Sequence, residues 1–112
     1  MSATRMGRIN EEIQRTLSQL IRGVKDPRVH GLISVTAVDT TADLKYAKVY
    51  VSVLDKNDAA EVLKGLKSAS GWLRRELGRE LSLRATPELT FIGDDSMAKG
   101  AHILELIENL DK

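Results

Sequence analysis

Cysteine is absent from this 112-residue chain, and aromatic side chains make up only 4% of it. The lack of cysteine excludes a disulfide scaffold, a thiolate metal site and a cysteine nucleophile. No apolar run approaches the roughly 20 residues of a membrane span, and the N-terminus lacks the apolar stretch of a signal peptide. We therefore expect a cytoplasmic protein that does not enter a membrane, folded as one domain over residues 1–112.

The sequence also lacks the constellations that catalysis requires. Its two histidines, His30 and His102, are far apart, and neither has a second ligand at a metal-binding spacing. The adjacent pair Asp94-Asp95 precedes a predicted helix, where a capping role is the simplest interpretation. Phosphate-binding loops, nucleophile elbows and dinucleotide fingerprints are missing. We expect a non-enzymatic protein that needs no metal and no cofactor.

The net charge of +1 hides an uneven distribution of charge along the chain. Residues 1–30 carry six basic and three acidic side chains, and residues 64–84 carry six basic and two acidic ones. Residues 94–112 are acidic, with five acidic and two basic side chains. This polarity suits a protein that docks on a polyanion, although solvated helix faces without a partner would have the same pattern.

Hydrophobic periodicity predicts a helix followed by two strands in the first half of the chain. Apolar residues recur every three or four positions within residues 4–23, which is the period of an amphipathic helix. Alternating β-branched residues predict a strand over 33–39, with the odd-numbered residues on one face. After a polar connector at 40–43, a strand over 46–53 places four apolar residues on its core face and two tyrosines on the other. The short connector favours antiparallel pairing of the two strands.

The second half predicts two helices that meet at a kink, then a third strand and a final helix. Asp58, followed by Glu61, is a variant of the capping box that opens the first of these helices. Small residues at 68–71 interrupt the apolar stripe, which resumes at Trp72 and stops at Gly78. A strand over 89–92 follows, and the last helix begins at residues 94–96. This order predicts an α+β fold, a three-stranded β-sheet packed against helices on one face.

The kink at residues 68–71 is the most specific local feature. Its small residues leave the backbone exposed where two helices meet, and the amides that open the second helix carry the positive end of its dipole. Arg74 and Arg75 follow within one turn. Such groups can hold a phosphodiester backbone through amide and bidentate guanidinium contacts. An equally open alternative is a packing kink, in which small residues only let two helices approach closely.

Two aromatic features remain ambiguous in the sequence. Trp72, the only tryptophan, has a spacing that favours a core or half-buried position over a platform for base stacking. Tyr46 and Tyr50 lie on the polar face of their strand, which is also common in proteins that bind nothing. That face supports an alternative function, a protein-binding adaptor that uses these tyrosines or an exposed strand edge.

Short fragments spread along the whole chain follow one another in an order and at spacings that are specific together, although each is weak alone. The fragments are Arg5, Arg8-Ile9, Glu11-Glu12-Ile13, Asp26-Pro27-Arg28, Val35-Thr36, Val38, Asp43-Leu44, Tyr46-Ala47-Lys48-Val49-Tyr50-Val51, Ser68-Ala69-Ser70-Gly71, Leu73-Arg74, Leu83-Arg84, Pro87-Glu88-Leu89, Phe91, Asp94 and Ser96. Over essentially its full length, the chain resembles the ribosome-binding factor A family.

This resemblance implies a type II KH-like fold in which a helix–kink–helix with an Ala-x-Gly motif, here Ala69-Ser70-Gly71, replaces the Gly-x-x-Gly loop. It implies binding to 16S rRNA of the small (30S) ribosomal subunit, near the 5′ end of that RNA and the neck of the subunit. The family assists late maturation of the subunit and processing of the 16S rRNA 5′ end, and it matters for growth in the cold. Its members act without catalysis of their own, alongside assembly GTPases, one of which can promote their release.

The two basic segments and the kink together predict an electrostatic docking surface for this RNA. Such contacts position a protein without reading many bases. The acidic last helix is not expected to lie on phosphate, and the longer C-terminal tail of some relatives has no counterpart from which contacts can be transferred. We expect a monomer. The predicted RNA-binding residues are Arg5, Arg8, Arg28, Lys45, Lys48, Ser68, Ala69, Ser70, Gly71, Arg74 and Arg75.

Overall fold

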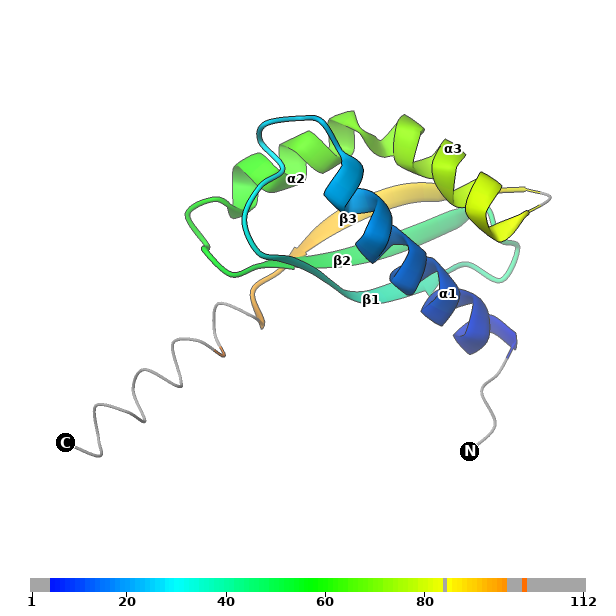
Figure 1. Cartoon of the computed structure of the whole chain (residues 1–112). Helices are drawn as coiled ribbons and strands as arrows, with labels where there is room; N and C mark the ends of the chain where they lie inside the picture. The colour runs from blue at the N-terminus through cyan, green and yellow to red at the C-terminus, as the bar shows by residue number, and fades with distance from the viewer. Residues whose placement is uncertain (1–4, 84, 97–99, 101–112) are drawn as a thin grey trace.

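The computed structural model describes residues 5–83, 85–96 and 100, and Figure 1 shows the arrangement of their helices and strands. The predicted last helix is described only at Ser96 and Gly100, and its inner positions Ile103, Ile107 and Leu110 lie outside the described residues. The elements are α1 (Arg5–Leu20), the 3₁₀ turn η1 (Ile21–Gly23), β1 (Ile33–Thr40), β2 (Tyr46–Val53), α2 (Ala59–Ser68), α3 (Ser70–Leu81) and β3 (Glu88–Asp94).

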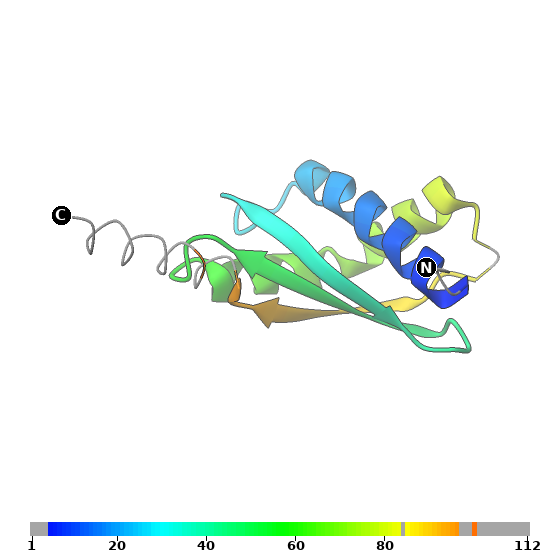
Figure 2. The ribbon, with the colours of Figure 1, turned by 90° about the horizontal axis from the view of Figure 1, so that it is seen from below.

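The three strands form one mixed sheet in the order β1-β2-β3. The predicted antiparallel pairing of β1 with β2 is confirmed, running from Ile33 opposite Val53 to Thr40 opposite Ala47. β3 pairs with β2 in parallel, because the chain returns through α2 and α3 before it re-enters the sheet. Seen from below, all three helices lie on one face of the sheet (Figure 2), which also confirms the predicted layer arrangement.

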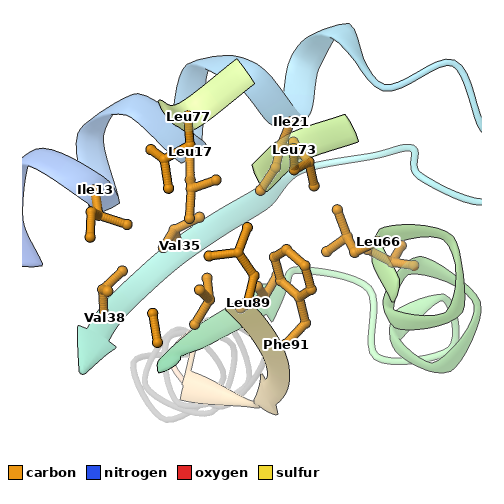
Figure 3. Packing of buried hydrophobic residues seen from close by; sticks show 14 of the residues in the cluster. Ile13, Leu17, Ile21, Val35, Val38, Leu66, Leu73, Leu77, Leu89 and Phe91 are labelled. Atoms are coloured by element: carbon orange, nitrogen blue, oxygen red, sulfur yellow. The ribbon is translucent and has the colours of Figure 1, made fainter. Parts of the chain in front are cut away.

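The core fills the space between the sheet and the helices, and it uses the valine-rich face of β2 as predicted. Ala47 and Val49 are fully buried, and Val51 and Val53 are nearly so. Figure 3 shows the side chains that meet them from the helices and from β3. The labelled residues of this cluster are Ile13, Leu17, Ile21, Val35, Val38, Leu66, Leu73, Leu77, Leu89 and Phe91. Burying a side chain of this size contributes roughly 1.5–3 kcal/mol, so this cluster is the main source of stability.

The strict alternation predicted for the first strand is wrong. A β-bulge shifts the register between Val35 and Ala37, so Thr36 is an extra residue in β1. Two residues of the bulged strand then oppose one residue of β2, and the inward face changes from odd to even positions. Val38 and Thr40 are buried beyond the bulge, whereas Ala37 is exposed.

One predicted helix boundary is confirmed and another needs correction. Asp58 immediately precedes α2 as predicted, but its carboxylate accepts no capping hydrogen bond, because its backbone is helical (φ −91°, ψ −10°) and not extended as a capping residue requires. Gly78 does not end α3, which continues to Leu81 and closes at Ser82 in the left-handed conformation (φ 51°). Gly78 instead serves packing, since a Cβ there would overlap the side chain of Thr86. Within the described ranges, no helix is long and apolar enough for a membrane crossing.

Candidate nucleic-acid interface

The predicted kink is confirmed at Ala69, the single residue between α2 and α3 (φ −88°, ψ 1°). Figure 1 shows the two helices meeting at an angle above the sheet. The Ala69 amide donates to the Gly65 carbonyl of α2 (3.0 Å), and the Leu73 amide donates to the Ala69 carbonyl as the first bond of α3 (2.9 Å). The amides of Ser70, Gly71 and Trp72 precede that bond, at positions that have no acceptor inside their own helix.

Two glycines show what the small residues around the kink do. A Cβ on Gly71 would meet no atom within 4 Å, so close packing does not require a glycine there. A Cβ on Gly65 would lie 2.6 Å from Val29 Cγ2 and 3.2 Å from Arg28 Cβ, so the loop before β1 lies directly against α2. The packing explanation therefore applies to Gly65, and the bare surface at Gly71 is available to a partner.

Arg28 is tied to this junction by its own protein. Its guanidinium forms an ion pair with Asp26 (2.6 Å) and donates to Ser68 Oγ (3.0 Å) at the end of α2. The hydrogen bonds that Asp26 accepts from the side chain and backbone of Arg28 lower the pKa of that carboxyl group from 3.8 to about 2. The side chain of Arg28 still keeps 39% of its surface exposed, so it can hold the loop in place and contact an anion at the same time.

The two arginines that follow the kink differ in whether they bind another part of the protein. The guanidinium of Arg74 donates from Nε and Nη2 to the backbone carbonyl of Thr86 (3.1 and 2.9 Å), which holds the connector before β3 against α3. Arg75 is exposed and forms no hydrogen bond or ion pair with any residue that the structure describes. Of this pair, Arg75 is the one available to phosphate without a structural cost.

The structure divides the other predicted residues between two further places. Arg5 and Arg8 lie in the first turn of α1, beside the connector that contains Lys45, since Ile9 and Leu44 line one small apolar cavity. α1 has 16 residues and spans about 24 Å, so this cluster is far from the kink at the other end of the helix. Lys48 is exposed between the buried Ala47 and Val49, so it lies on the face of the sheet opposite the core and does not share a surface with the kink.

Sequence reasoning missed a pocket beside the kink. The pocket encloses about 390 Å³ and is lined by residues 23–26, at the end of η1 and in the loop after it, and by Ser68, Ala69 and Trp72 around the kink. Trp72 keeps 38% of its surface exposed, so the predicted core or half-buried position is wrong and the indole lies at the surface. Lys25 contributes a cation to the lining. Only the fold brings residues 23–26 to the kink, and no local pattern in the sequence indicates it.

The open face of the sheet has a different character. Tyr46 is 53% exposed, whereas Tyr50 is partly buried and borders a hollow of about 500 Å³ with Lys56, Leu63 and Asp94. Ser52, predicted on this outward face, is fully buried. The described part of the chain holds no group of three side chains suited to a metal ion.

The fold and the kinked helix pair define a small α+β protein with a basic, partly bare surface at a helix–helix junction. A profile of the family described as ribosome-binding factor A matches residues 5–107. Ribosome-binding factor A of Acetivibrio thermocellus is 52% identical over 105 residues, which cover 92% of this chain and 85% of that protein. This chain belongs to the ribosome-binding factor A family.

Solved structures agree with that assignment. The crystal structure of ribosome-binding factor A from Thermus thermophilus is similar with a TM-score of 0.71 and 27% identity, covering 80% of this chain and 97% of the other. A homology model of Thermus thermophilus ribosome-binding factor A, fitted into a cryo-EM map of the complex of that protein with 30S, has a TM-score of 0.63 and 30% identity. That match covers 74% of this chain and 88% of the other.

Proposed function

We propose that this protein binds the small ribosomal subunit through 16S rRNA and assists its late maturation. The observation that supports this most directly is membership of the ribosome-binding factor A family, together with a relative placed in a 30S complex. Its role includes processing of the 16S rRNA 5′ end and support of growth in the cold. It acts in the cytoplasm without a catalytic step or a cofactor, as a monomer with one KH-like domain over residues 1–112. Assembly GTPases act beside it, and one of them promotes its release.

The docking surface proposed for this RNA follows the helix layer. The bare backbone at Gly71, with the exposed Arg75 and the partly exposed Arg28, provides a phosphate-binding region at the kink. Arg5, Arg8 and Lys45 provide a second cationic region about 24 Å away along α1, roughly the length of seven stacked nucleotides at 3.4 Å each. Lys48 contacts a different part of the folded rRNA, because it faces away from the helices.

Co-sedimentation with separated ribosomal subunits tests the proposal. The purified protein is expected to sediment with the small subunit and not with the large one. Its affinity should fall as salt rises, with a slope of roughly 0.7–0.9 in log K against log salt for each phosphate contacted. Equal binding to both subunits, or no binding at low salt, would contradict the proposed function.

The maturation role has its own test in cells that lack the protein. We expect precursors with an unprocessed 16S rRNA 5′ end to accumulate, and growth to slow most at low temperature. Expression of the intact chain should restore both properties, whereas a variant that no longer sediments with the small subunit should restore neither. Normal 5′ ends in the depleted cells would contradict the processing role and leave subunit binding unaffected.

The exposed Tyr46 favours one other candidate, a protein-binding adaptor that uses the open face of the sheet. Binding through this face would persist at high salt, because it would rest on aromatic contacts and strand-edge hydrogen bonds. The purified protein would then retain a protein partner and no RNA. Loss of that partner in Tyr46→Ala, with subunit sedimentation unchanged, would establish the adaptor as a separate activity.

A further inference from the structure

The pocket beside the kink, which we call the Trp72 pocket, combines an aromatic wall with a cationic rim. Its volume of about 390 Å³ lies within the range of roughly 300–1,000 Å³ typical of small-molecule sites. Trp72 precedes the fully buried Leu73, so α3 turns its inner side to the core and leaves the indole at the surface. An exposed indole at the mouth of a pocket offers a flat apolar face to a flat ligand.

Gly23, another residue of the lining, lies against the edge of the indole. A Cβ on Gly23 would lie 3.5 Å from Trp72 Cη2, in ordinary van der Waals contact, so the indole borders the glycine backbone directly. Gly23 does not have a positive φ, so other residues are tolerated there without backbone strain. Any longer side chain at this position would point toward the indole and occupy the pocket.

The charge around the pocket indicates what kind of ligand it fits. Lys25 lines the pocket, and the exposed Arg22 and Lys67 each adjoin a lining residue in the sequence. Asp26 is the only acid in the lining among the described residues, and its carboxylate is already paired with Arg28. An aromatic ring beside Lys25, which forms no ion pair with the residues that the structure describes, suits a planar base with a flanking phosphate more than an apolar or basic peptide side chain.

We propose that the Trp72 pocket receives one unstacked nucleobase of single-stranded RNA, which stacks on the indole while Lys25 contacts a flanking phosphate. This inference rests on the proposed function and adds to it a base-binding site beside the backbone-binding kink. Recognition of single-stranded RNA commonly uses splayed bases stacked on aromatic side chains. Stacking tolerates every base, so the site strengthens binding without selecting one sequence.

Trp72 is the only tryptophan in the chain, so its fluorescence reports on this pocket alone. The probes are single-stranded oligo(A) and oligo(U) of about seven nucleotides, the length that spans α1, and abasic strands of the same length. The base-containing strands are expected to quench the fluorescence, whereas the abasic strands should bind without quenching. Equal quenching by both kinds of strand, or none by either, would overturn the inference.

Three variants separate base stacking from electrostatic docking. Trp72→Ala should weaken binding of the oligonucleotides by about 5- to 150-fold, the range expected for loss of one stacked base, with an unchanged salt slope. Trp72→Phe should retain most of the affinity. Gly23→Leu fills the pocket with Trp72 still present and should weaken binding as Trp72→Ala does. Tyr46→Ala removes an exposed aromatic ring from the opposite face and serves as the matched control.

The outcomes distinguish a failure of this site from a failure of the proposed function. Wild-type protein that sediments with the small subunit, together with unaltered binding by Trp72→Ala and Gly23→Leu, would overturn the base-binding site alone. Wild-type protein that binds neither subunit nor oligonucleotide would overturn both proposals. Quenching by the extracted proteins of the small subunit, but not by its 16S rRNA, would replace the nucleobase with a protein ligand and overturn the inference.

Discussion

The two sides of the kinked helix pair differ in how they are bound to the rest of the protein. On the inner side, the loop before β1 presses on Gly65, and Arg28 links Asp26 to Ser68 at the end of α2. On the outer side, Gly71 has no neighbour within 4 Å of a Cβ position. A fixed inner side holds the bare outer side in one geometry, so little conformational entropy remains to be lost when a ligand binds there.

The largest expected effect is a difference in stability between variants of two neighbouring residues of α3, Leu73 and Trp72. Leu73→Ala should lower the free energy of unfolding by about 2–5 kcal/mol, because Leu73 is fully buried in the core. Trp72→Ala should cost much less, because the indole is partly exposed beside a pocket. Urea denaturation of both variants measures the difference. A similar loss for both would mean that Trp72 is a core residue.

The second contrast compares two glycines on either side of the junction. Gly65→Ala should destabilise the protein by about 1–3 kcal/mol, since its Cβ would overlap Val29 and the loop would have to move. Gly71→Ala should leave stability unchanged or raise it by up to about 1 kcal/mol, because alanine favours a helix more than glycine does.

Melting temperature distinguishes these two variants, and co-sedimentation adds a second reading. The new Cβ of Gly71→Ala stands between the backbone amides and a ligand, so binding to the small subunit should weaken although the fold is intact. Undiminished binding by Gly71→Ala would argue against close approach of RNA to the backbone at the kink.

The third contrast compares adjacent arginines. Arg74→Ala removes the hydrogen bonds to Thr86 and should cost about 0.5–1.5 kcal/mol of stability. Arg75→Ala should change stability by less than about 0.5 kcal/mol. It should reduce the salt slope of subunit binding by roughly 0.7–0.9, the contribution of one phosphate contact. An unchanged slope in Arg75→Ala would remove this residue from the docking surface.

The smallest effect concerns the pH dependence of the Asp26–Arg28 pair. The pKa of Asp26 is lowered in the folded protein, so its contribution to stability is present above pH 3.8 and lost as pH falls toward about 2. Asp26→Asn should therefore melt slightly below the wild type at neutral pH, and the two melting curves should converge near pH 2. A constant difference in melting temperature across this range would show that the pair is not formed in solution.

Sequence-based predictions agree with the structure where a feature depends on residues close together in the sequence. They fail where it depends on contacts between distant segments. The valine alternation over residues 46–53 predicts the core face of β2 correctly, because burial of one face depends on residues two apart. The kink is predictable because Ser68, Ser70 and Gly71 weaken a helix locally. The bulge at Thr36 is not predictable from the sequence, because it depends on how β1 pairs with β2. Gly78 misleads for the same reason, since it continues α3 where the connector before β3 packs against it.

The candidate site also has features that the sequence predicts and features that only the structure shows. Sequence alone locates its cations and its small residues, but it assigns Arg28, Arg74 and Arg75 the same role. The structure separates them, since Arg28 and Arg74 bind atoms of their own protein, whereas Arg75 has no such partner among the described residues. It also places Lys48 on the face of the sheet opposite the core and away from the kink. The partners of these side chains are distant in sequence, so no local pattern reveals which cations remain available.

The amino-acid sequence by itself determined the class of fold, the core face of β2, the position of the kink and the family to which the chain belongs. These properties follow from short-range periodicity, from backbone preferences and from the order of short fragments. The tertiary structure alone decided that β3 runs parallel to β2 and that residues 23–26 lie beside Trp72. The physical reason is that pockets, bulges and ion pairs form between segments that meet only after the core has closed.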